Sequence, residues 1–176
     1  ISVACIFMHL ELKGKNMAIV THAGGPAVML TDALSNGGLS VPHIDSTASK
    51  ELLAQLFPGS SVANPIDFLA TGTAQQLGTI LDYTTQKLDQ IDGVAVIFGT
   101  PGLTSVGDVY DVLDEKMKTS PKPIFPILPS VLTAGKEVSD FIARGRINFP
   151  DEVVFGKALA RVFHSPKPAP ASPGLP

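Results

Sequence analysis

The stretch Met17-Ala-Ile-Val-Thr-His-Ala-Gly-Gly-Pro-Ala-Val-Met-Leu-Thr-Asp-Ala-Leu34 decides the fold class of this chain. Residues 16–21 form a short apolar run that ends just before Gly24-Gly25, as is typical of a buried strand. Residues 26–35 continue as a helix with proline in its first turn, closed by Asn36-Gly37-Gly38. A strand that leads through a glycine-rich turn into a helix predicts an α/β domain.

The rest of the chain continues this alternation. Residues 94–98 are apolar at every position, which is typical of a parallel strand covered on both faces. Further strands are predicted at 39–44, 123–128 and 147–149, with a short extended piece in 62–69. Helices are predicted at 1–12, 46–55 (capped by Ser46 or Thr47), 73–88 (capped by Thr71 or Thr73), 106–117, 137–144 and 151–163. The alternation predicts a three-layer flavodoxin-like (Rossmann-like) α/β domain with a mainly parallel sheet.

Three segments are expected along the chain. Residues 1–12 are interpreted as the end of a preceding helix or a linker, so the sequence is expected to be a piece of a longer polypeptide. Residues 13–164 are the predicted flavodoxin-like domain. Residues 165–176 hold five prolines in twelve positions, which predicts an extended or disordered tail.

Composition excludes several functional classes. The chain has 176 residues, of which 44% are hydrophobic and 16% charged, so it can bury a core. A net charge of −3 with dispersed basic residues argues against nucleic-acid binding, and no apolar run is long enough to span a membrane. The single cysteine, Cys5, excludes a disulfide framework and predicts a cytoplasmic protein. The four histidines lack zinc-ligand spacing, so no metal site is expected.

The loop between the first strand and its helix is the candidate site. In open α/β sheets, ligands lie beyond the carboxyl ends of the strands. Glycines there leave the backbone uncovered, and a helix start offers free amides with positive dipole character. The loop therefore suits an anion such as phosphate, although Pro26 removes one amide and no Walker lysine is present. The alternative is a tight turn that needs glycine only for its backbone geometry.

Together with the helix after it, this loop resembles a signature of the ADP-forming acyl-CoA synthetases, the acetate–CoA ligases that make ATP. A second matching block is Ser61-Val-Ala-Asn-Pro-Ile-Asp-Phe68, and a third, weaker one is Val94-Ala-Val-Ile-Phe-Gly-Thr-Pro101. The likeness covers about residues 12–163. It is closest to the carboxyl-terminal flavodoxin-like domain of the α part. More distantly, it is similar to the carboxyl-terminal domain of the succinyl-CoA synthetase β subunit.

The resemblance implies a function. Enzymes of this superfamily convert acyl-CoA, ADP and phosphate into acid, ATP and CoA through a phosphohistidine held between the N-termini of two helices. The parent enzyme is then implied to use Mg, ADP/ATP, CoA and phosphate, with no cofactor bound tightly to this domain. Implied partners are the CoA-binding and phosphohistidine domains of the same chain, an ATP-grasp domain or subunit, and further copies in an oligomer. The phosphohistidine loop is absent from these residues, so the fragment alone is expected to be inactive.

The resemblance also implies site residues. Those expected to meet phosphate are Thr21, His22, Ala23, Gly24, Gly25 and Ala27. Relatives often carry asparagine at the position of His22 and glycine at that of Ala27. Three roles stay open for His22: a donor to phosphate, a structural turn residue, or a catalytic residue that is itself phosphorylated.

Four supporting candidates lie further along the chain. Asp67 either orients a histidine or touches a metal–phosphate, or it braces its own loop. Asn64 supports the site or only fixes the turn before Pro65. Thr100 and Gly102 come after a central strand and either contact substrate or a neighbouring domain, or simply connect elements.

Two other functions are weighed against this one. A ligand-sensing, catalytically silent synthetase-like region of a protein lysine acetyltransferase, or another regulatory module, is the main alternative. It would be distinguished by the domains next to it. A flavin-binding flavodoxin fits poorly, because aromatic residues are 6% of the chain and tryptophan is absent.

Overall fold

The computed structural model describes residues 1–100 and 106–166. Its centre is a four-stranded sheet in the order β2-β1-β3-β4, and every pair is parallel. The strands are β1 (Met17–Thr21), β2 (Ile66–Asp67), β3 (Gly93–Ile97) and β4 (Ile124–Ile127). The predicted parallel sheet is thereby confirmed.

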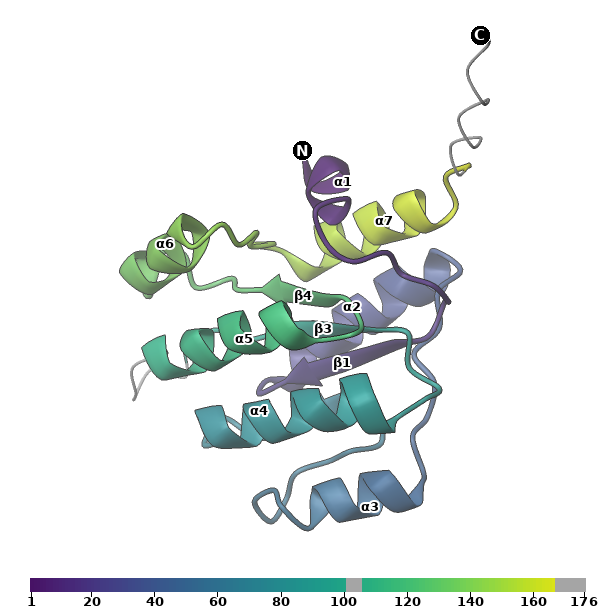
Figure 1. Cartoon of the computed structure of the whole chain (residues 1–176), viewed down its shortest axis with the longest axis vertical. Coiled ribbons are helices and arrows are strands. Elements are labelled where there is room, and N and C mark those ends of the chain that lie inside the picture. The colour runs from purple at the N-terminus through teal and green to yellow at the C-terminus, as the bar shows by residue number, and fades with distance from the viewer. Residues whose placement is uncertain (101–105, 167–176) are drawn as a thin grey trace, which may run out of the picture.

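Helices cover both faces of the sheet (Figure 1). One layer holds α1 (Ser2–Ile6), α2 (Gly24–Asn36) and α7 (Glu152–Phe163). The other holds α3 (Thr47–Leu53), α4 (Ala74–Asp82), which runs on into a π-helical turn at Tyr83–Lys87, α5 (Gly107–Thr119) and α6 (Gly135–Ala143). Helices on both sides of a parallel sheet make the predicted three-layer flavodoxin-like fold.

Successive side chains of β1 point to opposite faces of the sheet and so belong to two separate hydrophobic cores. Met17 and Ile19 pack with α2 and α7, whereas Ala18 and Val20 pack with the helices of the opposite layer. All four side chains are fully buried. The strand is therefore a continuous apolar run because each face meets its own helical layer.

The strand predicted at 39–44 is wrong, because only Ser40 forms a bridge there, to Asn16. The edge beside β1 is instead assembled from separate pieces. Ser40 pairs with its start and β2 with its end. Between them lies the side-chain amide of Asn64, whose Oδ1 accepts from Ile19 N–H at 2.9 Å. Its Nδ2 donates to Met17 O at 2.9 Å and to Pro42 O at 3.0 Å, so one side chain replaces a strand residue.

The opposite edge uses the same device. The strand predicted at 147–149 is reduced to a single bridge between Phe149 and Ile127. The Asn148 side chain pairs with the residue after β4, accepting from Leu128 N–H at 2.9 Å and donating to Leu128 O at 3.0 Å. Both sheet edges are therefore completed by asparagine amides.

Helix boundaries differ from the predictions mainly at the N-terminus. The predicted helix at 1–12 is observed only over Ser2–Ile6, because the chain then turns to cross the starts of the strands, where Leu12 packs beside Gly93. The predicted caps are confirmed: Ser46 and Thr73 each accept from the amide three residues on, within capping boxes.

Candidate functional site

The carboxyl ends of the parallel strands bring most of the predicted site residues to one edge of the sheet, on the left in Figure 1. Thr21 ends β1 and stands opposite Asp67, which ends β2. His22 comes directly after β1, and Gly99 and Thr100 come after β3. Gly102 lies outside the described residues. The topology thus gathers three separate sequence blocks at one place.

Two of the loop residues hold the turn itself. The buried Thr21 hydroxyl accepts from Ala23 N–H at 3.0 Å and donates to Ala23 O at 2.9 Å. Ala27 is 1% exposed and, as the fourth residue of α2, has an intrahelical acceptor for its N–H. Thr21, Ala23 and Ala27 therefore shape the loop, and their polar groups are already used.

The first turn of α2 is open. Its N-cap, Ala23, provides no side-chain cap, so the N–H groups of Gly24 and Gly25 face outward without a capping oxygen. Neither glycine has a positive φ, and a Cβ built on either would meet nothing within 4 Å. Glycine is therefore not needed at these two positions for backbone conformation or for internal packing. What it does provide is room above two amides at the positive end of a helix.

His22 spans the gap between the loops after β1 and β3. Its Nε2 accepts from Gly99 N–H at 2.9 Å, which places the proton of the neutral ring on Nδ1. The ring meets Phe98 edge to face, with ring centroids 4.5 Å apart. Since Nε2 accepts from Gly99 N–H, the donor proton of the ring is on Nδ1, which also interacts with the backbone of His22 itself.

Burial lowers the pKa of His22 below its usual 6.5, and the charge of the Asp67 carboxylate opposes this shift. Burial also lowers the pKa of His9. In the unfolded chain both histidines bind protons more readily than they do in the folded protein. The free energy of unfolding should therefore decrease as the pH falls below about 6.5.

Replacing His22 tests this pH dependence. His22→Gln keeps an acceptor for Gly99 N–H but cannot be protonated. We expect its urea midpoint to fall less than that of the unmodified chain between pH 7.5 and pH ~5. The matched control is His43→Gln, which makes the same change at an exposed histidine. Equal pH dependence in all three proteins would contradict the assignment.

The two predicted residues near β2 are tied to backbone groups. Asp67 Oδ1 accepts from Leu69 N–H at 2.9 Å, which is the loop brace that the sequence left open. Its charge still acts on His22. The amide of Asn64 is committed to β1 and Pro42. Asn64 therefore positions the sheet edge.

The loop after β4 adds residues that the sequence patterns did not indicate. Ser130 Oγ accepts from Thr100 N–H at 2.7 Å, and the Thr100 and Thr133 hydroxyls lie 2.5 Å apart. These hydroxyls join the loops after β3 and β4. The position of Ser130 just beyond a buried strand is the signal that could have drawn attention to it.

Neither a metal centre nor a membrane-spanning helix is found among the described residues. That part of the chain holds no group of three or more His, Cys, Asp or Glu side chains arranged to bind a metal ion. Within residues 1–100 and 106–166, no helix has the length and apolar character needed to cross a bilayer.

Comparison with known proteins identifies relatives of the chain. No family model matches it. It is 33% identical over 88 residues to the α subunit of an ADP-forming acetate–CoA ligase II from Pyrococcus furiosus, and 29% identical over 85 residues to an ADP-forming acetate–CoA ligase I from Archaeoglobus fulgidus. These matches cover 50% and 48% of this chain but only 18% and 12% of the relatives.

Solved structures share the fold. PH0766 from Pyrococcus horikoshii superposes with a TM-score of 0.81 at 23% identity, over 92% of this chain and 38% of that one. The dinucleotide-forming acetyl-coenzyme A synthetase 1 of Ca. Korarchaeum cryptofilum, solved with phosphate and ADP, gives 0.74 at 18% identity, over 86% and 33%. The chain is thus similar to the ADP-forming acetate–CoA ligases, as its motifs predict, and the similarity spans less than a fifth of the length of these relatives.

Proposed function

We propose that this chain is one domain of an NDP-forming acyl-CoA synthetase and supplies a helix N-terminus that binds phosphate. The parent reaction converts acyl-CoA, ADP and phosphate into acid, ATP and CoA through a phosphohistidine on another domain. The observation that carries the proposal is the uncapped first turn of α2, where Gly24 and Gly25 leave two amides open beside His22.

The role of each residue depends on which of its atoms are free. The N–H groups of Gly24 and Gly25 donate to phosphoryl oxygens, and the helix dipole favours their negative charge. His22 donates through Nδ1, because Gly99 occupies Nε2. Asp67 keeps its loop against the end of β1 and lies close enough to influence the imidazole. Mg, brought with the nucleotide, would neutralise phosphate charge during transfer.

Exposed apolar side chains at the same edge support contacts with other domains. Val28, one residue beyond the first turn of α2, is 60% exposed, and Leu132, in the loop after β4, is 96% exposed. Apolar groups next to an anion site suit a covering partner better than open water. The proposed partners are the phosphohistidine and CoA-binding domains and an ATP-grasp domain or subunit, without which this domain is inactive.

An amide-resolved NMR titration with inorganic phosphate tests the proposal, with CoA and ADP as separate controls. We expect saturable shifts confined to residues 22–27, and weaker binding as ionic strength rises. The same titration in the presence of the partner domains should give tighter binding. If residues 22–27 do not respond in either setting, the glycines serve another purpose and a ligand-sensing or scaffold function gains support.

A further inference from the structure

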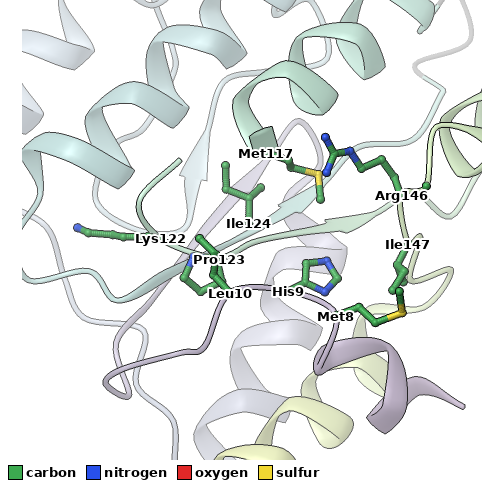
Figure 2. Close-up of a pocket in the computed structure, with 10 residues that line it drawn as sticks. Met8, His9, Leu10, Met117, Lys122, Pro123, Ile124, Arg146 and Ile147 are labelled. Atoms are coloured by element: carbon green, nitrogen blue, oxygen red, sulfur yellow. The ribbon is translucent and has the colours of Figure 1, made fainter. Parts of the chain in front are cut away.

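A cavity of about 310 Å³ opens at the amino end of β4, whereas the proposed phosphate site lies at the carboxyl ends of the strands. Four separate segments form it: residues 8–10, the end of α5, residues 122–124 and residues 145–147 (Figure 2). Its volume falls within the lower part of the range for small-molecule sites.

Apolar side chains come from six of the ten described residues that line the cavity. Met117 and Ile124 lie on one side of His9, and Ile147 lies next to Met8; Leu10 and Pro123 complete the apolar part of the lining (Figure 2). Met8 is 76% and Leu10 54% exposed, so much of the surface of these two side chains remains open to solvent. Two thioethers give the wall an adaptable shape. Such a wall suits the apolar body of a ligand.

Arg146 supplies the polar group. Its Nε donates to Asp114 Oδ1, and its Nη2 donates to Asp114 O at 3.3 Å. These bonds hold the guanidinium beside Met117, across the cavity from Met8 and His9 (Figure 2). They leave Nη1 without a hydrogen-bond partner among the described residues. The side chain is 20% exposed, so this donor is positioned and mostly shielded from water.

Charge at the cavity favours an anion. None of the ten described residues that line it is acidic, whereas Arg146 and Lys122 are cationic. The Lys122 ammonium turns away to Leu88 O, at 3.0 Å, and lines the cavity with its carbon stem (Figure 2). The carboxylate of Asp114, which holds Arg146, is also paired with Lys118, so these three side chains together keep one net positive charge.

His9 contributes a flat, uncharged surface. Its Nδ1 donates to Cys5 O at 3.1 Å, since a carbonyl can only accept. The ring packs on Phe125 and Phe149, with centroids 4.8 and 5.8 Å away. Burial and the nearby Arg146 lower the pKa of His9, so at neutral pH it adds no charge of its own.

We propose that this cavity binds a small organic monocarboxylate, with the carboxylate on Arg146 and the apolar body between Met117, Ile124 and Ile147. A guanidinium matches a carboxylate in charge and shape, and the lining leaves one such contact beside an apolar space. The site shares no residue with the proposed phosphate site, so either proposal can fail without the other.

The test is an NMR titration of the 176-residue chain with hexanoate and benzoate, each paired with its neutral amide. We expect saturable shifts at residues 8–10 and 145–147, and binding at least tenfold weaker for the amides, because they lose a charge-assisted hydrogen bond. Met117→Trp should fill the cavity and weaken carboxylate binding at least tenfold. Its matched control, Ile142→Trp at an exposed α6 position, should leave binding unchanged.

Two further variants separate charge from folding. Arg146→Gln should weaken carboxylate binding at least tenfold, and Arg146→Lys less, because lysine keeps the charge beside Asp114. Should Arg146→Gln fail to fold, the Met117→Trp result stands on its own. The proposal is overturned by an absence of saturable shifts up to ~10 mM ligand, by equal binding of acids and amides, or by undiminished binding to Met117→Trp.

Discussion

Replacing Gly24 and Gly25 together by alanine is expected to weaken phosphate binding by at least tenfold while leaving the chain as stable as before, or more stable. A Cβ at either position meets nothing within 4 Å, and alanine is a better helix former than glycine by about 1 kcal/mol. The added methyl groups would instead occupy the space through which a phosphoryl group approaches the two amides. In the parent enzyme, we expect acyl-CoA-dependent ATP synthesis to fall by about 100-fold, as when oriented donors at a reacting oxygen are lost.

The matched control for this pair is Gly135→Ala. Gly135 is also the first residue of a helix, α6, and its Cβ would likewise meet nothing within 4 Å. It should leave phosphate binding and activity unchanged. Thermal unfolding and the phosphate titration of both variants check the expectation. Undiminished phosphate binding by the double variant would remove the reason for placing a ligand at α2.

Asn64→Ala is expected to lower the free energy of unfolding by about 2–4 kcal/mol and the melting temperature by roughly 10 °C. The substitution removes the hydrogen-bond partner of Ile19 N–H, Met17 O and Pro42 O, which all pair with the Asn64 amide. Two of these groups belong to β1, whose residues are fully buried, so water cannot fully replace the lost amide.

A second variant separates the amide from the backbone. Asn64 has φ of 72°, a conformation that glycine adopts without penalty, so Asn64→Gly removes the amide alone. Asn64→Gly should therefore show most of the destabilisation expected for Asn64→Ala. Asn36→Ala, at an exposed asparagine, should leave the free energy of unfolding almost unchanged. Calorimetry and urea unfolding provide the measurements. A melting temperature within ~2 °C of the unmodified chain for Asn64→Gly would show that the amide contributes little.

Much of the fold could be predicted because it depends on local patterns. The apolar runs around Met17–Thr21 and Gly93–Ile97 report strands covered on both faces, and such strands occur in parallel sheets. The caps at Ser46 and Thr73 use side chains three residues apart. The place of the candidate site could be predicted as well, since the carboxyl ends of parallel strands share one edge.

The sequence alone therefore determined the layers, the order of elements and the loop that offers glycine at a helix start. It could not determine the sheet edges. Asn64 and Asn148 serve as edge residues through side-chain bonds, which leave no periodic signal, whereas the segments predicted as strands there form single bridges. Tertiary structure also decided which loop groups are free. Thr21 and Ala23 bind each other, whereas Gly24 and Gly25 remain open. The reason is physical: periodicity records which faces are buried, but hydrogen-bond partners are settled only when distant segments meet.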